Sequence, residues 1–292
     1  MKRILITGAG SYVGTQVAQY LARWPEKYQV ESLDMRGEDW KKASFAGFHA
    51  VFHVAGLVHN AKTRDDPAQW PKYEAVNTQL ALETAQKAKA EGVGQFLFMS
   101  TAGVYGIDGK IGQSVVIDAN TPLNPKNNYG RSKLLAEQAI APLEDDHFKV
   151  VILRPPMIYG KGCKGNYVTL KKLADKLPVF PKVENQRSML YIENFAEFLR
   201  LMVDNDERGL FCPQNATYTN TSVMVAQIAR ARGKKMALVP GFTWAIKLLG
   251  RVTGLAEKAF GSWCYDRSLS NYSQDYCIKS LEESIWETEG EI

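Results

Sequence analysis

Short apolar runs and longer stretches with helical periodicity alternate through the first half of the chain. A short apolar run bounded by turn residues predicts a buried strand, and apolar residues spaced three or four apart predict a helix. Strands are predicted at 3–6, 29–33, 50–54, 95–99 and 149–153, and helices at 12–22, 73–90 and 129–140. Such alternation is typical of βαβ units with right-handed crossovers, so we predict an α/β fold with a doubly wound parallel sheet.

The regular alternation stops after residue 153. Residues 154–167 are loop-like because they are rich in proline and glycine. Beyond them the pattern predicts a strand at 188–192 and helices at 167–176, 194–203, 221–232 and 243–249. We therefore predict two parts: residues 1–155 with 185–212 returning to them, and a smaller C-terminal lobe of 156–184 and 213–292.

Composition is that of an ordinary globular protein, with 45% hydrophobic and 23% charged residues in a chain of 292. The net charge of +5 suits an anionic small substrate, but the basic residues are scattered, which argues against a nucleic-acid partner. The chain runs from its first residues directly into a strand, without the apolar region of a signal peptide. We expect a cytoplasmic protein without a transmembrane segment.

The cysteines and histidines carry no recognisable site. Four cysteines show neither CxxC spacing nor a nearby histidine cluster, so we expect reduced thiols and no metal: Cys163, Cys212, Cys264 and Cys277. His53 falls within an apolar strand and His59 just after it. Both are expected to be structural.

The turn TGAGSYVG, Thr7 to Gly14, follows the first strand and opens the first helix. Glycines let a backbone approach a pyrophosphate, and a helix N-terminus supplies amide groups and a positive dipole end. We therefore predict a dinucleotide-binding turn made by Gly8, Ser11, Tyr12, Val13 and Gly14. The alternative is a glycine-rich turn with a structural role alone.

Asp34 and Arg36 end the second strand and bear on the choice of cofactor. A carboxylate at this point would accept hydrogen bonds from the adenosine ribose and repel a 2′-phosphate, which favours NAD. The guanidinium of Arg36 would pair with that phosphate instead, which favours NADP. The sequence thus predicts NAD(P)(H) with a lean to NAD(H).

Tyr129 and Lys133 in the segment YGRSK lie four residues apart and share one face of a helix. A phenol has a pKa near 10, and a neighbouring cation lowers it, so Tyr129 becomes a usable acid/base. Thr101, 28 residues earlier at the end of a strand, would hold the substrate oxygen against Tyr129. We predict these three residues as the catalytic set.

The same spacing recurs at Tyr167 and Lys171, and an arbitrary Tyr/Lys pair on a solvated helix is common. The two copies differ in context. Tyr129 opens a helix after a Pro/Asn loop and follows a strand that ends in Ser/Thr, whereas Tyr167 has no such partner upstream. We predict Tyr129 as catalytic and Tyr167 as structural or adjacent to substrate.

Together these segments resemble the extended short-chain dehydrogenase/reductase family, the NAD-dependent epimerase/dehydratase group that acts on nucleotide sugars. The resemblance spans nearly the whole chain: TGAGSYVG, HVAG, Asn77, STAGVYG, YGRSK, LRPPMIYG and QRSMLYIENFAE. It implies a Rossmann-like dinucleotide-binding domain at 1–155 and a nucleotide-sugar-binding lobe. It also implies cofactor contacts at Ala55, Asn77, Ser100, Tyr129, Lys133 and Pro155, and substrate contacts at Thr101, Asn166 and Arg187, the last on the substrate diphosphate.

Two departures from the family pattern are visible. Ser11 stands where the family usually has the middle glycine of GxxGxxG, so the turn must tolerate a side chain or use Gly10. The gap from Asp34 to Ala50 is too short for a further helix and strand, because a parallel crossover alone needs roughly 10 to 12 residues. We predict that the strand usually flanking the adenine is missing.

Within the family, the chain resembles most the capsule and O-antigen enzymes that reduce a UDP-2-acetamido-2,6-dideoxy-hexos-4-ulose to UDP-N-acetylfucosamine or UDP-N-acetylquinovosamine. A UDP-hexose or UDP-N-acetylhexosamine 4-epimerase with tightly bound NAD uses the same residues and remains the alternative. A dehydratase is disfavoured because no carboxylate follows Thr101 directly. A non-catalytic sensor would need no proton donor. The resemblance leaves a homodimer open.

One further segment, 242–263, mixes aromatic and aliphatic residues with Lys247, Arg251 and Lys258. Such a mixture could touch a membrane surface. Its glycines weaken a continuous helix, so a packed element of the C-terminal lobe is favoured.

Overall fold

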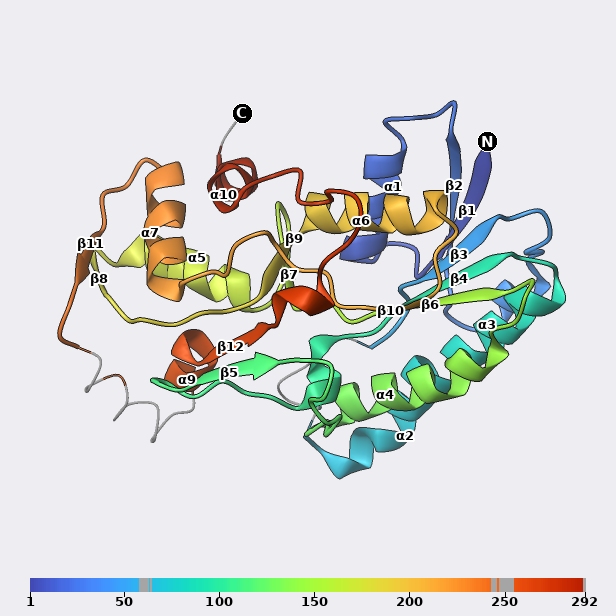
Figure 1. The fold of residues 1–292 in the computed structure, drawn as a ribbon, viewed down its shortest axis with the longest axis horizontal. Coiled ribbons are helices and arrows are strands. Elements are labelled where there is room, and N and C mark those ends of the chain that lie inside the picture. Colours follow the sequence, from blue (N-terminus) through green and yellow to red (C-terminus); the bar gives the residue numbers. More distant parts are fainter. Residues whose placement is uncertain (58–62, 64, 243–245, 247–254, 291–292) are drawn as a thin grey trace. The chain divides into compact units, whose positions relative to one another are not determined.

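Six parallel strands form one sheet, as the alternation predicted, in a computed structural model that describes residues 1–57, 63, 65–242, 246 and 255–290 (Figure 1). The spatial order is β10-β6-β4-β3-β1-β2. The strands are β1 (Lys2–Thr7), β2 (Tyr28–Leu33), β3 (Ala50–His53), β4 (Gln95–Met99), β6 (Lys149–Leu153) and β10 (Gly209–Phe211). Five match the predicted strands to within a residue or two; β10 was not predicted.

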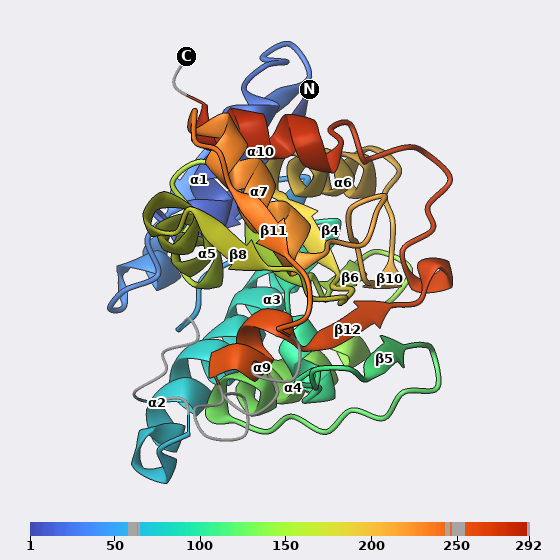
Figure 2. The same cartoon turned by 90° about the vertical axis from the view of Figure 1, so that its left-hand side faces the viewer.

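Helices cover both faces of this sheet, in the doubly wound manner (Figures 1 and 2). On one face lie α1 (Tyr12–Leu21) and most of α6 (Ile192–Asp204), and on the other α3 (Leu80–Ala90) and α4 (Asn128–Ile140). Phe195 of α6 packs on Phe52 of β3 with ring centroids 6.1 Å apart. The central strands are buried from both sides, which explains why they read as continuous apolar runs.

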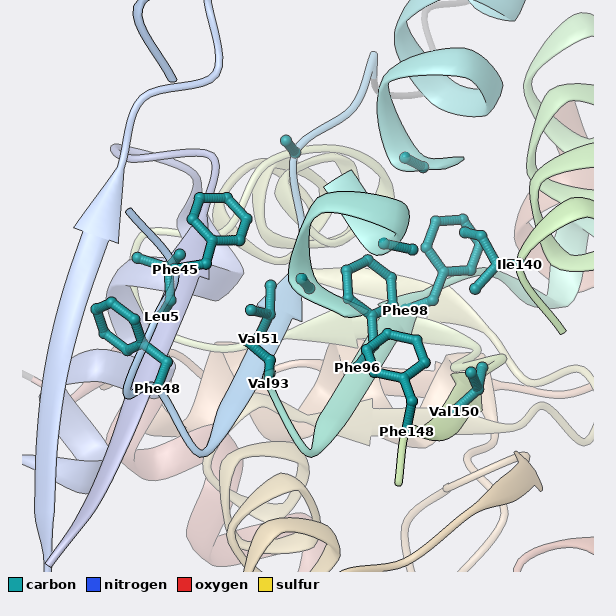
Figure 3. Packing of buried hydrophobic residues seen from close by; sticks show 14 of the residues in the cluster. Leu5, Phe45, Phe48, Val51, Val93, Phe96, Phe98, Ile140, Phe148 and Val150 are labelled. Atoms are coloured by element: carbon teal, nitrogen blue, oxygen red, sulfur yellow. The ribbon is translucent and has the colours of Figure 1, made fainter. Parts of the chain in front are cut away.

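The core on the α3 and α4 side is built from aromatic and aliphatic side chains (Figure 3). The strands contribute Leu5, Val51, Phe96, Phe98 and Val150, and the surrounding segments contribute Phe45, Phe48, Val93, Ile140 and Phe148. Because this apolar surface is removed from water, it stabilises the sheet that carries the strand ends.

The segment between β2 and β3 confirms the missing strand. Here β2 is the edge of the sheet, and residues 35–49 contain a short 3-10 helix, Asp39–Lys42. Three side chains of this segment, Trp40, Phe45 and Phe48, are buried in the core. They fill space beside α3 that the helix of a full crossover would otherwise cover.

The chain divides into two units that differ somewhat from the predicted boundaries. The first unit is 1–106, 122–155 and 195–213, and the second is 107–121, 156–194 and 214–292. Residues 107–121 and 185–194 thus belong to the second unit, not to the first as predicted. They do so because their short strands pair with partners there: β5 (Ser114–Ile117) with β12 (Ser262–Tyr265), and β9 (Met189–Tyr191) with β7 (Met157–Tyr159).

The second unit also contains a third parallel pair, β8 (Val179–Pro181) with β11 (Ala237–Val239). Its helices are α5 (Asn166–Lys176), α7 (Thr221–Ala231), α9 (Leu255–Phe260) and α10 (Leu281–Glu289). Figure 1 shows α5 beside α7. Strand β7 lies in the stretch 154–167 that was predicted to be a loop. It is three residues long, which is too short to give a recognisable periodicity.

Some predictions lie outside the described residues. The helix at 243–249 does, apart from the buried Ile246, and so does His59. Residues 243–245 and 247–254 of the segment 242–263 also lie outside them. Across the part of the chain that the structure describes, no helix is both long and apolar enough to cross a membrane.

Candidate active site

The predicted phosphate-binding turn links β1 to α1 and has the required backbone. Gly8 and Gly10 adopt φ angles of +86° and +78°, which favour glycine. A Cβ on Gly8 would lie 2.8 Å from the Cα of Ala55, so the turn and the end of β3 are in close backbone contact. The structure therefore brings Gly8 and Ala55 together, at the carboxyl ends of adjacent strands.

Ser11 does not disturb this turn. It has an extended backbone, φ −68° and ψ 143°, and its hydroxyl accepts a hydrogen bond from the Gly14 amide at 3.2 Å. Ser11 is thus the N-cap of α1, while Gly10 takes the left-handed conformation. The turn therefore both tolerates the Ser11 side chain and uses Gly10, the two alternatives that the sequence left open.

Asp34 and Arg36 form an exposed ion pair with each other at the end of β2. Arg36 Nη2 lies 2.5 Å from Asp34 Oδ2, and the Arg36 amide also donates to Oδ1 at 3.0 Å. These hydrogen bonds hold the pKa of Asp34 down at about 2. Either residue must leave its partner to meet a ribose or a 2′-phosphate.

Asn77 connects the chain after β3 to α4. Its side chain is fully buried, accepts from the Leu57 amide at 2.7 Å, and donates to the Ser132 hydroxyl at 3.0 Å. It lies in a π-helical turn, Glu74–Gln79, a local widening often found at functional sites. A Cβ on Gly56 would meet Asn77 Oδ1 at 2.9 Å and Lys133 Nζ at 3.4 Å, so these groups converge.

The three predicted catalytic residues come from β4 and α4. Asn127 caps α4 by accepting from the Gly130 amide at 2.9 Å, which fixes the first turn that carries Tyr129. Thr101 follows β4 and hydrogen-bonds the Tyr129 phenol. Thr101 and Tyr129 thus lie next to each other, and their catalytic role stays a prediction.

Lys133 is buried and lies one turn after Tyr129. Its Nζ donates to the Met99 carbonyl at 2.8 Å and lies 4.7 Å from the centre of the Phe98 ring. Burial lowers its pKa to about 8, and the nearby Glu137 opposes that shift. The ammonium is thus held at the end of β4 and close to its deprotonation point at neutral pH.

The pKa of Tyr129 departs from the expectation. Burial raises it, the Thr101 hydrogen bond lowers it, and the Tyr73 phenol raises it further. The ammonium of Lys133 was expected to set this pKa, but its hydrogen bond goes to Met99 rather than to the phenol. The error arose because helix spacing gives a shared face and does not give the direction of a long side chain.

A buried charge network behind the site was missed. Ser100, predicted as a cofactor contact, donates its hydroxyl to the carboxylate of Glu137. Glu137 also pairs with Arg154, both almost fully buried. The signal was available, since Glu137 follows Lys133 by four residues on the same helix face. Pro155 lies beside this network, and its carbonyl accepts from the Ala102 amide at 3.0 Å.

His53 is structural, as predicted. It is fully buried between Phe96 and Phe98, and its Nδ1 lies 3.0 Å from the Thr7 hydroxyl. Burial, aided by the Lys133 charge, lowers its pKa to about 3, so the ring is neutral. Among the described residues no cluster of His, Cys, Asp and Glu could hold a metal ion.

Two of the predicted substrate residues, Asn166 and Arg187, lie in the second unit. Arg187 donates from Nη1 to the Ala259 carbonyl at 3.2 Å, and its backbone pairs with Thr219 and Trp263. Burial lowers its pKa, and the nearby Asp108 carboxylate counters this. Asn166 is exposed at the first turn of α5, which no side chain caps.

Tyr167 belongs to the core of the second unit. Its ring stacks on Tyr159 with centroids 5.4 Å apart, and burial beside the Glu289 carboxylate raises its pKa. Lys171 pairs with the same carboxylate at 2.9 Å. This second Tyr/Lys pair is therefore structural.

Comparison with known proteins agrees with this geometry. The model of the NAD dependent epimerase/dehydratase family matches residues 4–211. A UDP-glucose 4-epimerase of Vibrio cholerae is 28% identical over 279 residues, 88% of this chain and 84% of that protein.

Two solved structures share the fold. UDP-glucuronic acid 4-epimerase from Bacillus cereus, in complex with NAD, has a TM-score of 0.73 at 16% identity, covering 98% of this chain and 96% of that one. The dTDP-4-dehydrorhamnose reductase of Bacillus anthracis, in complex with NADP, has a TM-score of 0.68 at 19% identity, covering 98% of each. Because the family model matches residues 4–211, well over half of the chain, the chain belongs to the NAD dependent epimerase/dehydratase family.

Proposed function

We propose that the protein is an NAD(P)H-dependent reductase of a UDP-linked 2-acetamido-2,6-dideoxy-hexos-4-ulose. Its product would be UDP-N-acetylfucosamine or UDP-N-acetylquinovosamine, for the assembly of surface polysaccharide. The observation that carries the proposal is the meeting of Thr101 with Tyr129 one helical turn from the buried Lys133. This set supplies a proton donor and a fixed cation to a reacting carbonyl.

The residues present fit a nicotinamide dinucleotide. A Cβ on Gly8 would lie 2.8 Å from the Cα of Ala55, so this position of the turn takes only glycine, whose backbone a pyrophosphate can approach. Asp34 and Arg36 stand ready for the ribose, and Lys133 and Asn77 converge where the nicotinamide half would end. Met35, Trp40 and Val76 line a pocket of about 250 Å³ that we assign to the adenine side.

The bound nicotinamide would supply the hydride for C4 of the sugar. Thr101 would hold the C4 oxygen by a hydrogen bond, and Tyr129 would give its phenolic proton to that oxygen as the C–H bond forms. Lys133 would bind the nicotinamide ribose. The raised pKa of Tyr129 keeps the phenol protonated beforehand, which suits a proton donor.

One feature favours a reductase over an epimerase. An epimerase must keep its cofactor while the oxidised sugar turns over, whereas a reductase must exchange it in every cycle. Because β2 is the edge of the sheet, no further strand of the described chain lies beside Asp34 and Arg36 at the proposed ribose end of the cofactor site. A ribose end that no such strand covers supports exchange.

On the substrate side, we propose that Arg187 binds the UDP diphosphate and that Asn166 contacts the nucleotide sugar. A guanidinium can bind phosphate oxygens in pairs, and an uncapped helix N-terminus such as that of α5 offers amide donors to an anion.

Cofactor retention tests the choice between reductase and epimerase. The purified protein would be assayed for conversion of UDP-GlcNAc and UDP-glucose without added cofactor, after its bound nucleotide has been measured by absorbance and mass spectrometry. We expect nucleotide-free protein and no conversion. Stoichiometric NAD together with sugar interconversion would establish the 4-epimerase instead.

A further inference from the structure

A buried ion pair behind the catalytic set has no part in the chemistry above. The side chains of Arg154 and Glu137 are only 8% and 4% exposed, and Arg154 Nη2 lies 2.5 Å from Glu137 Oε2. Arg154 Nε donates to the two carboxylate oxygens at 3.0 and 3.2 Å. Desolvating two charges is costly, and apolar residues of similar volume often serve stability equally well. The pair therefore calls for a role other than stability.

The Glu137 carboxylate links the segments that carry the catalytic groups. Glu137 itself lies on α4, two turns after Tyr129. It accepts from the hydroxyl of Ser100, the residue before Thr101. Its partner Arg154 precedes Pro155, whose carbonyl accepts from the amide just after Thr101 at 3.0 Å. Both sides of Thr101 are thus tied to one carboxylate on the helix.

The same carboxylate acts on Lys133. The Glu137 carboxylate lies one helical turn from Lys133 along α4. Its charge raises the pKa of Lys133 and so opposes the lowering caused by burial. From β3, His53 lies near enough to interact with the Lys133 charge, and its ring is neutral. From β4 the aromatic face of Phe98 is turned to the ammonium.

The remaining ionisable groups around this network are tyrosines and one cysteine. Arg154 donates to the Tyr105 hydroxyl at 3.0 Å, and that hydroxyl lies 3.9 Å from the sulfur of Cys212. The Tyr73 phenol raises the pKa of Tyr129. Among the described residues, Glu137 is thus the charged group that acts on Lys133, and Arg154 is the charged partner of Glu137.

We propose that Glu137 is a positioning residue for the proposed reaction: its carboxylate, bound by Ser100 and Arg154, holds the Thr101 segment against α4, one helical turn from the ammonium of Lys133. This inference rests on the catalytic set of the proposed function, and it holds equally for a reductase and an epimerase.

Substitutions of Glu137 and of Arg154 should shift the pKa of Lys133 in opposite directions. Glu137→Gln removes the negative charge and leaves Arg154 unmatched, so the ammonium becomes less favourable. Arg154→Gln leaves the carboxylate unmatched, so the ammonium becomes more favourable. A purely structural pair would behave differently, because loosened packing would admit water and raise the lysine pKa in both variants.

The test is a direct titration of Lys133 in cofactor-free protein. Lysine labelled with ¹³C at Cε would be followed by NMR from pH 6 to 11, with the Lys133 signal assigned from its absence in Lys133→Met. We expect a wild-type midpoint near the pKa of about 8, moved down by about one unit in Glu137→Gln and up by about one unit in Arg154→Gln. Unchanged midpoints, or a rise in both variants, would overturn the proposal.

Glu137→Asp separates charge from position. It keeps the carboxylate but shortens its reach, so we expect a nearly normal Lys133 midpoint together with a lower kcat. If near-UV circular dichroism shows that Glu137→Gln does not fold, the double variant Glu137→Gln/Arg154→Gln is compared with Arg154→Gln. The double variant should have the lower midpoint, and equal midpoints would refute the role of Glu137. Because no substrate is used, failure here is distinct from failure of the proposed activity.

Discussion

In the proposed reaction, Tyr129 is the residue that donates the proton. Tyr129→Phe keeps the buried ring and removes only the proton donor, so turnover should fall by about 10² to 10⁴ while the Kd for NADH changes little. Steady-state kinetics and fluorescence titration of NADH measure the two quantities.

The matched control is Tyr167→Phe, which removes a buried hydroxyl from the other Tyr/Lys pair. It should leave kcat within about a factor of two, because Tyr167 packs in the core of the second unit, whereas Thr101 and α4 belong to the first. A greater loss at position 167 than at 129 would refute the assignment.

Lys133 predicts how activity depends on pH. Its pKa is lowered to about 8 by burial, so the ammonium is lost as pH rises through that value, and kcat/KM should fall above it. Unfolded lysine keeps its proton up to about 10.4, so between the two values the unfolded state binds more protons and this residue's contribution to stability rises with pH. The loss of activity should therefore precede any loss of fold, as circular dichroism over the same range can check.

In the proposed cofactor site, Asp34 and Arg36 set the preference between NAD(H) and NADP(H). Asp34→Ala removes a carboxylate from the ribose 2′ position and should favour NADP(H) relative to NAD(H). Arg36→Ala should weaken NADP(H) selectively. Four dissociation constants measured by calorimetry for each variant settle the matter, and constant NADP(H)/NAD(H) ratios would mean that neither side chain reaches the ribose.

At the scale of single elements, Ser11 shows how one departure from the family pattern is accommodated. Its hydroxyl caps α1, so Ser11→Ala should lower the free energy of unfolding by about 0.5 to 2 kcal/mol, whereas Ser11→Gly should cost only a few tenths. Denaturant unfolding compares the two. If glycine proves the more damaging substitution, the cap has no energetic role.

The long buried elements could be predicted from the sequence, and the short ones could not. Strands such as β3 and β4 are covered on both faces and read as unbroken apolar runs. Strands β5 and β12 have four residues each and pair across more than a hundred intervening residues. Such pairing leaves no local periodicity, so the boundary of the second unit was misplaced at 107–121.

The candidate site was predictable where spacing carries the chemistry. Thr101, Tyr129 and the glycine turn stand in recognisable local contexts. The spacing places Glu137 on the helix face of Lys133, but the sequence gives no such signal for Arg154, and only the packing of α4 against β4 and β6 shows that the two are buried together. The same limit explains the error over Lys133, whose ammonium turned to a backbone carbonyl.

At the scale of the whole molecule, the two units divide the proposed work: the first would hold the cofactor and the catalytic set, and the second the nucleotide sugar. Arg187→Ala should raise the KM for substrate strongly and leave NADH binding unchanged, since Arg187 lies in the second unit. The alternative is a local structural role with Asp108 and the Ala259 carbonyl. Calorimetric titration of UDP decides, because equal affinities in both proteins would remove Arg187 from the site.

Transfer of an isotopic label tests the central claim most directly. The protein would be incubated with a UDP-2-acetamido-2,6-dideoxy-hexos-4-ulose and NADH or NADPH carrying deuterium at nicotinamide C4 on either face, and the product examined by NMR and mass spectrometry. The account predicts one deuterium at sugar C4 from one of the two faces, with one cofactor oxidised for each sugar reduced. An unlabelled product with no loss of nicotinamide absorbance, or no reaction of the ketosugar at all, would contradict it.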